Sequence, residues 1–301
     1  NITKASECKF NQTIEGDVQM SVVNQVDFSN PLKKIWNENG CTIGAWVLGT
    51  DPVMAEATAL AGFDWICIDM QHGWIGLESL PKLVQSVALA GAVPIVRVPA
   101  NEIWLIGRAL DAGAYGVMVP LVNTAEQAAR AVAACGYMPG GGRSVGAYRP
   151  APLIASSPQQ ADKEIICIVQ IESKEALDNL EEICKVPGVD VVYIGPGDLA
   201  LSLGLKSKIE IDATVFESVR NTALKNGVMP AMHGESGSEA LWAIENGFRV
   251  TTAGADIDYL HIEAREALAI AKRVSPDDVK NKSWLARVPR IAVGPPSQVH
   301  E

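Results

Sequence analysis

Short apolar runs alternate with longer amphipathic stretches along most of the chain. The apolar runs are continuous rather than alternating, as in strands buried on both faces. They lie at 42–48, 65–69, 93–98, 116–122, 165–171, 191–195, 228–232 and 249–253. Segments rich in Ala and Leu, with apolar residues at helical spacing, lie at 31–39, 51–61, 77–90, 102–112, 125–135, 176–184, 213–226, 237–245 and 260–273.

This alternation predicts an α/β protein with a parallel sheet covered by helices. Eight repeats in about 230 residues fit a closed (β/α)8 TIM barrel. An open, doubly wound sheet is the alternative, but no GxGxxG motif opens the first helix. We therefore expect one barrel domain at 31–274, a polar N-terminal arm at 1–30 and a C-terminal tail at 275–301.

The composition argues against several classes of partner. The 301 residues are 48% hydrophobic and carry a formal net charge of −10, without a long basic run, which argues against a nucleic-acid partner. No apolar run approaches the roughly 18 residues of a membrane span. The six cysteines occur singly, without a CxxC pair, as in a reducing compartment. We therefore expect a cytoplasmic enzyme with no membrane partner.

The barrel predicts where the active site lies, because such sites form at the carboxyl ends of the strands. Glu172 and Asp198 each follow an apolar strand, and the two strands are joined through one helix. The two carboxylates should therefore emerge side by side, as hard oxygen ligands suited to a divalent cation. Alternatively, either acid alone could cap the helix that follows it.

Three further ionisable residues are expected at the same edge. His72 follows Asp69 by three residues, and a carboxylate near an imidazole raises its basicity, although His72 could also be a turn residue beside Gly73. Arg97 lies in a strand and needs an anion, which is either a substrate or a structural acid such as Asp111.

A long glycine-rich stretch at 136–162 lacks an obvious pattern. It contains Arg143, Tyr148 and Arg149, and such long loops are commonly functional. We expect it to reach the same face of the barrel as the strand ends.

Taken in order, several motifs resemble the HpcH/HpaI family of class II, metal-dependent aldolases, with 4-hydroxy-2-oxoheptanedioate aldolase as its type member. The matching segments are GFDWICIDMQHG, PIVRVPAN, ALDAGAYGVMVPLVNTAEQA, GGRSVG, IVQIESKEALDNL and VDVVYIGPGDLALSLG. Macrophomate synthase and its fungal relatives belong to the same superfamily, and the extended termini of this chain are similar to theirs.

The resemblance implies a barrel of the phosphoenolpyruvate/pyruvate type, with Mg2+ or Mn2+ held by Glu172 and Asp198 and Co2+ as a further candidate. Pyruvate would chelate the metal, Arg97 would face the enolate oxygen, and His72, oriented by Asp69, would handle protons. By the same matching, four residues would line the substrate and metal site: Gln170, Gly195, Pro196 and Gly197.

The resemblance also implies an assembly. Asp111 would lie at a subunit boundary, Arg143 would belong to a substrate-binding loop, and an exchanged C-terminal helix at 260–273 would join the subunits of a homohexamer. The sequence departs from the family pattern at Ser144, where the family has glycine, and at Gln71, where bacterial members have an acid. His233 has no assigned role.

The expected function is a metal-dependent carbon–carbon lyase that forms a pyruvate enolate. It would cleave or form 4-hydroxy-2-oxo acids with an aldehyde, or decarboxylate oxaloacetate. No lysine stands where GPGD ends the sixth strand, which disfavours a Schiff base. The alternatives are enolate addition to a pyrone, a CoA-ester lyase and a barrel without catalytic activity.

Overall fold

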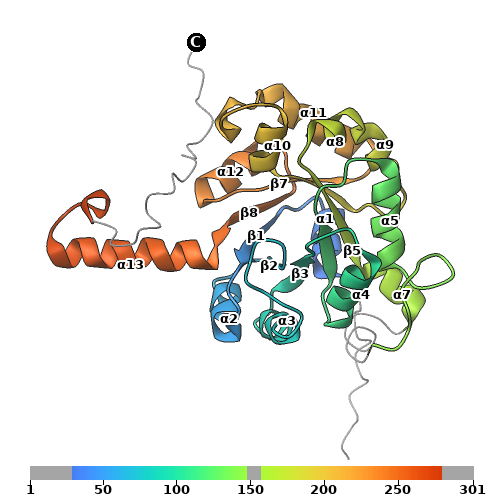
Figure 1. Ribbon diagram of the computed structural model, residues 1–301, viewed down its shortest axis with the longest axis horizontal. Coiled ribbons are helices and arrows are strands. Elements are labelled where there is room, and N and C mark those ends of the chain that lie inside the picture. The colour runs from blue at the N-terminus through green and yellow to red at the C-terminus, as the bar shows by residue number, and fades with distance from the viewer. Residues whose placement is uncertain (1–28, 148–156, 280–301) are drawn as a thin grey trace, which may run out of the picture.

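The structure is a computed structural model that describes residues 29–147 and 157–279. Eight parallel strands close into a barrel, each pairing with the next and β8 pairing with β1, as Figure 1 shows. The strands are β1 Thr42–Val47, β2 Trp65–Asp69, β3 Val93–Arg97, β4 Gly116–Val119, β5 Ile166–Ile171, β6 Val191–Ile194, β7 Met229–Met232 and β8 Val250–Ala255. The predicted (β/α)8 barrel is confirmed, and each predicted strand differs only at its ends.

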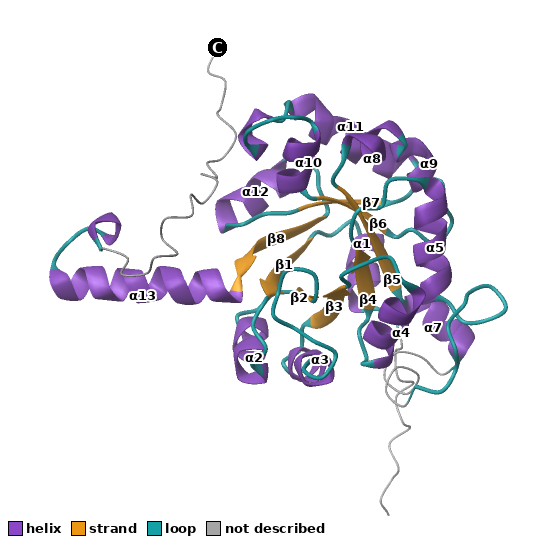
Figure 2. Ribbon diagram, viewed as in Figure 1, coloured by secondary structure: helices purple, strands orange, loops and turns teal. Residues whose placement is uncertain are grey.

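Helices surround the barrel in chain order (Figure 2). They are α1 Pro31–Asn37, α2 Pro52–Leu60, α3 Leu80–Leu89, α4 Ile103–Asp111, α5 Ala125–Cys135, α7 Pro158–Glu164, α8 Lys174–Asp178, α9 Leu180–Cys184, α10 Pro196–Ser202, α11 Ala213–Lys225, α12 Gly237–Glu245 and α13 Asp256–Lys272, with short 3-10 turns at Lys208–Glu210 and Pro276–Asp278.

The strands carry two apolar cores because successive side chains point to opposite faces. One core lies between the sheet and the helices, and the other fills the barrel. Trp65, Ile95, Met118, Ile168 and Tyr193 are among the buried residues of the inner core. The barrel is therefore packed rather than hollow, as in other barrels of this size.

Helix α1 closes the barrel at the amino ends of the strands. Leu32 and Trp36 belong to the inner core, and the Trp36 indole Nε1 donates a hydrogen bond to Thr42 Oγ1 at 3.0 Å. The buried Asn30 side chain accepts from the Leu32 N–H and donates to the Glu164 carbonyl. Since this end is closed, the pocket described below opens at the carboxyl ends.

Two predicted helices differ from those in the structure. The helix expected at 176–184 is two short helices, α8 and α9, separated at Asn179, whose side-chain Nδ2 binds the Asn123 carbonyl at 2.9 Å. The last helix begins at Asp256 rather than 260. The Asp256 carboxylate accepts from the backbone N–H groups of Leu48, Gly49 and Ile257, which fixes the first turn to the barrel.

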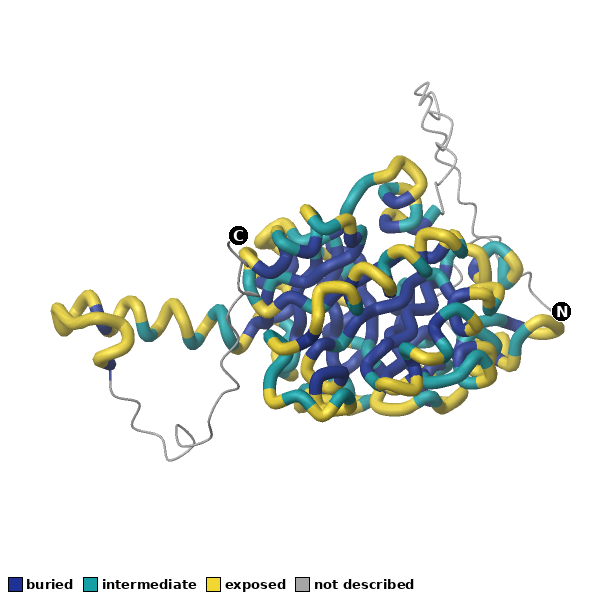
Figure 3. Tube along the Cα trace, turned by 90° about the horizontal axis from the view of Figure 1, so that it is seen from above, coloured by how far each residue is buried: buried dark blue, intermediate teal, exposed yellow. Residues whose placement is uncertain are grey.

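Helix α13 extends away from the barrel (Figures 1 and 3). Large apolar side chains lie exposed along it, at positions that do not share one helical face: Ile257, Leu260, Ile262, Leu268 and Ile270. In the part of the chain that the structure describes, no helix is both long enough and apolar enough to cross a membrane.

The predicted arm and tail fall mostly on residues 1–28 and 280–301, outside the described residues, as do Tyr148 and Arg149. Of the six cysteines, the five in the described ranges are unpaired, and all but Cys41 are buried. The chain from 157 to 164 is not irregular as expected, since α7 occupies most of it.

Candidate active site

The inward-facing rows of the barrel change from apolar to polar at the carboxyl ends of the strands. Trp65 and Cys67 on β2 lie in the inner core, and Asp69 takes the next position of that row. In the same way, Arg97 continues the inner row of β3 and Gln170 that of β5. Because every second side chain of a strand points inward, these polar groups lie at the carboxyl end of the packed barrel interior.

Asp69 and Arg97 form an ion pair in paired register on adjacent strands. Arg97 Nε donates to Asp69 Oδ1 at 2.8 Å, and Nη2 donates to Oδ2 at 2.6 Å. Burial by itself would lower the pKa of Arg97, but the Asp69 carboxylate more than offsets this and raises the pKa. The guanidinium thus stays charged while Nη1 remains available to a ligand.

The indole ring of Trp46 supports this guanidinium. The Arg97 Cζ lies 4.4 Å from the ring centroid, in cation–π geometry. Trp46 comes from β1 and belongs to the inner core. The sequence interpretation missed Trp46, although a large aromatic residue on an inward strand position gave a signal.

Asp69 does not contact the His72 imidazole as the sequence led us to expect. Its Oδ1 accepts from the backbone N–H groups of Gln71 at 3.0 Å and of His72 at 3.3 Å. Among the hydrogen bonds of the described residues, none joins the Asp69 carboxylate to the His72 ring. Asp69 instead fixes the turn that carries His72, because a short acidic side chain readily binds backbone N–H groups that follow it.

Glu172 is a buried carboxylate beyond the end of β5. Its Oε1 accepts from the Leu121 N–H at 2.7 Å, and Leu121 has a φ of 53°, an unusual value for a leucine. A Cβ at Gly195 would lie 2.6 Å from Glu172 Oε2, so glycine is needed for this approach. Burial raises the pKa of Glu172, and the charge of Asp198 raises this pKa further.

Asp198 lies in the first turn of α10, and Gly195 is the residue before that helix. Asp198 is therefore not the N-terminal cap that was the alternative interpretation. Its side chain is exposed, whereas Pro196 is buried beneath it. Glu172 likewise binds the β4 end rather than capping α8, whose cap is Ser173.

The donor set fits a hard divalent cation. The charge of Asp198 acts on Glu172, and the buried Gln170 Oε1 has no hydrogen-bond partner within the described residues. Carboxylate and amide oxygens are ligands that Mg2+ accepts, with water completing its shell. The described residues contain no cluster of three or more His, Cys, Asp or Glu placed to hold a metal ion, so two carboxylates would be its charged protein ligands.

Arg143 does not reach this edge within the chain. Its buried Nη2 donates to Asp111 Oδ1 at 2.8 Å, and its Cζ lies 4.6 Å from the Tyr137 ring centroid. Asp111 is the last residue of α4, and barrel helices run back toward the amino ends of the strands. Within this chain Arg143 therefore contacts the end of α4 rather than the pocket, and the expected placement of 136–162 at the strand carboxyl ends stays a prediction.

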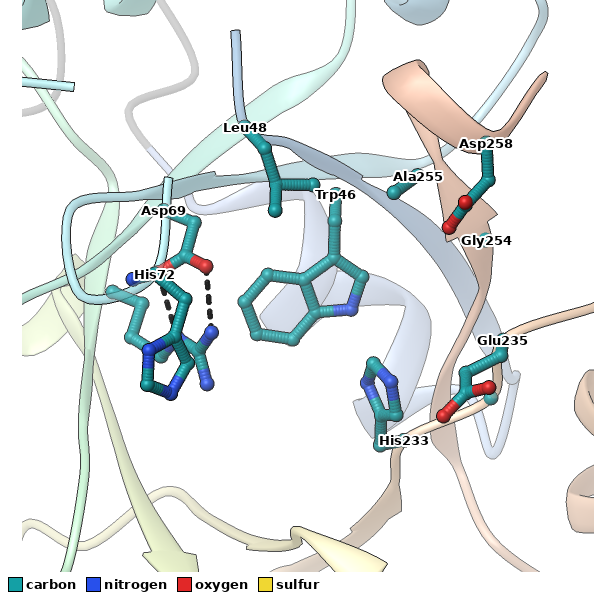
Figure 4. A pocket seen from close by; sticks show the side chains of 11 residues that line it. Trp46, Leu48, Asp69, His72, His233, Glu235, Gly254, Ala255 and Asp258 are labelled. Carbon is teal, nitrogen blue, oxygen red and sulfur yellow. Dashed lines mark hydrogen bonds and ion pairs between the residues drawn. The ribbon is translucent and has the colours of Figure 1, made fainter. Parts of the chain in front are cut away.

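A pocket of about 280 Å³ opens beside Arg97, as Figure 4 shows. Asp69 and His72 lie on one side of it, where Asp69 binds Arg97, and Glu235 and Asp258 lie on the other. The residues that line it are Trp46, Leu48, Asp69, His72, Arg97, His233, Gly234, Glu235, Gly254, Ala255 and Asp258. Sequence patterns did not single out Glu235 and Asp258, because acids in loops and in the first turns of helices are common.

His233 lies on the same side of the pocket as Glu235, as Figure 4 shows. Its Nδ1 is 3.2 Å from the buried Tyr193 hydroxyl and 3.4 Å from Thr252 Oγ1. Burial lowers the pKa of His233 to about 3, helped by the positive charges of Lys208 and Arg97. The imidazole is therefore neutral near pH 7.

A closed (β/α)8 barrel with carboxylates, an arginine and a histidine at the carboxyl ends of its strands defines a barrel enzyme. A family model described as HpcH/HpaI aldolase/citrate lyase matches residues 42–240. The chain belongs to this family, which confirms the resemblance found in its motifs.

Relatives agree with this assignment. A 2-dehydro-3,6-dideoxy-6-sulfogluconate aldolase of Pseudomonas putida is 36% identical, covering 79% of this chain and 95% of the relative. A hydroxypyruvate/pyruvate aldolase of Rhizorhabdus wittichii is 35% identical, covering 81% and 99%.

A solved structure also agrees. The crystal structure of an HpcH/HpaI aldolase/citrate lyase family protein from Burkholderia cenocepacia matches with a TM-score of 0.76 and 34% identity, covering 81% of this chain and all of that one. The protein is a carbon–carbon lyase of the aldolase type.

Proposed function

We propose that this lyase forms the enolate of pyruvate at the Arg97 edge of the barrel and joins it reversibly to an aldehyde, giving a 4-hydroxy-2-oxo acid. The same site would decarboxylate oxaloacetate, because loss of carbon dioxide produces the same enolate. One observation carries the proposal: Arg97 is held charged by Asp69 and Trp46, with a guanidinium nitrogen left over for an anion.

The proposal includes a divalent cation held by Glu172 and Asp198, with Gln170 beside it. The family is generally dependent on divalent metals, and Mg2+ or Mn2+ suits these oxygen ligands, with Co2+ as a further candidate. The partnerless Gln170 oxygen and the raised pKa of Glu172 support this site, because both call for a positively charged partner. When bound, the ion would supply a Lewis acid for the oxygens of pyruvate.

Arg97 would stabilise the negative charge of the enolate. As the methyl C–H bond of pyruvate breaks, its electron pair forms the carbon–carbon double bond and the keto oxygen becomes negative. A fixed guanidinium stabilises that charge without reorganising, and such preorganised groups are worth roughly 100- to 1,000-fold in rate. The backbone from Gly195 to Asp198, with Pro196 and Gly197 between them, would receive the pyruvate carboxylate.

His72 would take the methyl proton and return one to the product. It lies at the pocket on an Asp69-supported turn, and its ring is exposed. Histidine is the side chain used most often as a general base. In the forward direction, the enolate carbon attacks the aldehyde carbon and the resulting alkoxide takes up a proton.

Oxaloacetate decarboxylation tests this proposal without an aldehyde. We expect pyruvate release that depends on added Mg2+ or Mn2+, stops with EDTA and is lost in Glu172→Gln. The exposed acid Glu245, at the far end of α12, offers a matched control in Glu245→Gln. Turnover that is equal with metal and with EDTA, or equal in Glu172→Gln, would contradict the metal site.

We also propose a homo-oligomer, a hexamer by resemblance, in which α13 is exchanged between subunits and Asp111 lies at a boundary. The exposed apolar side chains on several faces of α13 support this, because a helix of that kind is normally surrounded by protein. In such an assembly, the Asp111–Arg143 pair could approach the active site of a neighbouring subunit. A cytoplasmic location stays a prediction.

A further inference from the structure

The pocket has two sides of opposite chemistry. Arg97 and His72 stand on the side proposed to form the enolate, and Glu235 and Asp258 stand on the other (Figure 4). Glu235 comes from the loop between β7 and α12, and Asp258 comes from the first turn of α13. We call the side formed by His233, Glu235 and Asp258 the acidic wall.

Glu239 holds the Glu235 loop in place. The Glu235 backbone N–H donates to Glu239 Oε2 at 2.9 Å, and the Glu239 carboxylate accepts from Lys208 Nζ at 3.1 Å. The Glu235 side chain is 46% exposed and adds one surface ion pair to Lys208, at 3.2 Å. Its carboxylate can therefore be changed without removing the contacts that fix the loop.

The acidic wall is negative even with Lys208 counted. That lysine is shared by two carboxylates, so the group of Lys208, Glu235 and Glu239 has a net charge of −1. The carboxylates of Glu235 and Glu239 already lie close to the Lys208 ammonium. Lys208 is therefore not available as a partner for an anionic ligand.

His233 adds a neutral polar group to this wall. Its Nδ1 faces Tyr193 and Thr252, and its other ring nitrogen, Nε2, has no partner among the described residues. Because the pKa of His233 is lowered to about 3, the ring brings no positive charge at neutral pH. The wall thus offers two carboxylates and an uncharged imidazole, all of which accept or exchange hydrogen bonds with hydroxyl groups.

We propose that the acidic wall binds the aldehyde partner and selects uncharged, hydroxylated aldehydes over aldehydes that carry a carboxylate or another anionic tail. This inference rests on the proposed function, since it names the second substrate of the same site. Hydroxyl groups of the aldehyde donate to Glu235 and Asp258, whereas an anionic tail meets like charge in a partly desolvated pocket. Glyceraldehyde and succinic semialdehyde represent the two classes.

The test compares kcat/KM for aldol addition of pyruvate to these two aldehydes. We expect the protein to prefer glyceraldehyde by at least tenfold, and the preference to fall at least fivefold in Glu235→Gln with Asp258→Asn. Glu235→Gln alone is measured beside it, because its loop contacts persist. Glu245→Gln removes the same charge at the far end of α12 and should keep the ratio.

Two results would overturn the inference: a preference for succinic semialdehyde in the unaltered protein, or a ratio that stays within twofold in the folded double variant. Deuterium exchange at the pyruvate methyl group, measured without any aldehyde, separates this inference from the proposed function. If deuterium exchange occurs but the protein prefers succinic semialdehyde, only the aldehyde-binding role of the acidic wall is overturned. Absence of exchange overturns the enolate proposal and this inference with it.

Discussion

At the scale of the residue, Asp69 connects most of the candidate site. One carboxylate holds the Arg97 guanidinium in a two-point contact and also binds the turn that carries His72. Such contacts remove the rotamer freedom of Arg97 before any substrate arrives, which is what preorganised charge requires. A lysine cannot replace Arg97 here, because its ammonium cannot make the planar two-point contact with the Asp69 carboxylate.

Arg97→Lys should therefore reduce enolate formation by at least about 100-fold while the protein stays folded. Deuterium exchange into pyruvate, followed by NMR, measures this step. Arg108 lies exposed in the last turn of α4, so Arg108→Lys is a matched control that should exchange like the unaltered protein. An exchange rate within threefold in Arg97→Lys would show that the guanidinium does not stabilise the enolate.

Gly195→Ala should weaken Mn2+ binding by roughly 10- to 100-fold, the range seen when groups supporting a metal ligand are changed. The added Cβ would lie 2.6 Å from Glu172 Oε2 and push that carboxylate aside. Gly197 is the control, because a Cβ there meets nothing within 4 Å. Calorimetric titration with Mn2+ measures the affinity of Gly195→Ala and of Gly197→Ala. Equal Mn2+ affinities in the two variants would refute Glu172 as a ligand.

His233 predicts a pH effect on stability. The unfolded chain protonates this imidazole near pH 6.5, but the folded protein does so only near its lowered pKa of about 3. Between these values the unfolded state binds the extra proton, so the free energy of unfolding falls as the pH falls, by up to about 1.4 kcal/mol per unit.

The measurement is urea unfolding from pH 6 to pH 4 in the unaltered protein and in His233→Gln. As the pH falls, we expect the free energy of unfolding to fall more steeply in the unaltered protein than in His233→Gln. The difference between their slopes against pH should approach about 1.4 kcal/mol per unit. Parallel slopes would mean that His233 titrates normally in the folded state.

Sequence patterns predicted the ionisable residues of the site better than their contacts. Arg97 was found because an inward strand position seldom carries charge without a partner, whereas Asp69 and Glu172 were found because each lies at the end of an apolar strand run. The partner of Asp69 was misjudged, because nearness in sequence favoured His72 over Arg97 on the adjacent strand. The pairing of Arg143 with Asp111 was not foreseen, because a glycine-rich stretch does not show which helix it packs against.

At the scale of the element, the strands and most helices follow directly from hydrophobic period. The exceptions have polar side chains that bind backbone from another segment. Asn179 divides α8 from α9 by binding the Asn123 carbonyl, and Asp256 starts α13 early by binding the β1 end. Such long-range contacts are invisible to a local pattern.

Helix α13 makes a prediction of its own. If it is exchanged between subunits, Leu260→Glu with Ile262→Glu should break the assembly, because both side chains are more than half exposed in the single chain. Light scattering should give the mass of six chains for the unaltered protein and a smaller mass for this variant. Glu263→Gln changes the exposed residue that follows Ile262 and should leave the mass unchanged.

A monomeric unaltered protein, or a double variant with the original mass, would contradict the exchanged helix. The barrel itself should survive, since α13 contacts it mainly near β1, β8 and α2. Circular dichroism distinguishes loss of assembly from loss of folding.

At the scale of the whole molecule, one end of the barrel is closed and the other is chemically active. Helix α1 fills the mouth at the amino ends, and the inner core of large side chains separates it from the pocket. The charged groups are therefore gathered at the carboxyl ends of the strands, where Arg97 lines the pocket and Glu172 and Asp198 follow β5 and β6. Fold and family could be predicted from the sequence, but the acidic wall needed the three-dimensional arrangement.

The most direct test of the central claim is deuterium exchange at the pyruvate methyl group, with Mn2+ and with EDTA. We predict rapid exchange that requires the metal and is lost in Glu172→Gln and Arg97→Lys. Exchange of equal rate with EDTA, or no exchange by the folded protein with Mg2+, Mn2+ or Co2+, would contradict a metal-dependent pyruvate enolate at this edge of the barrel.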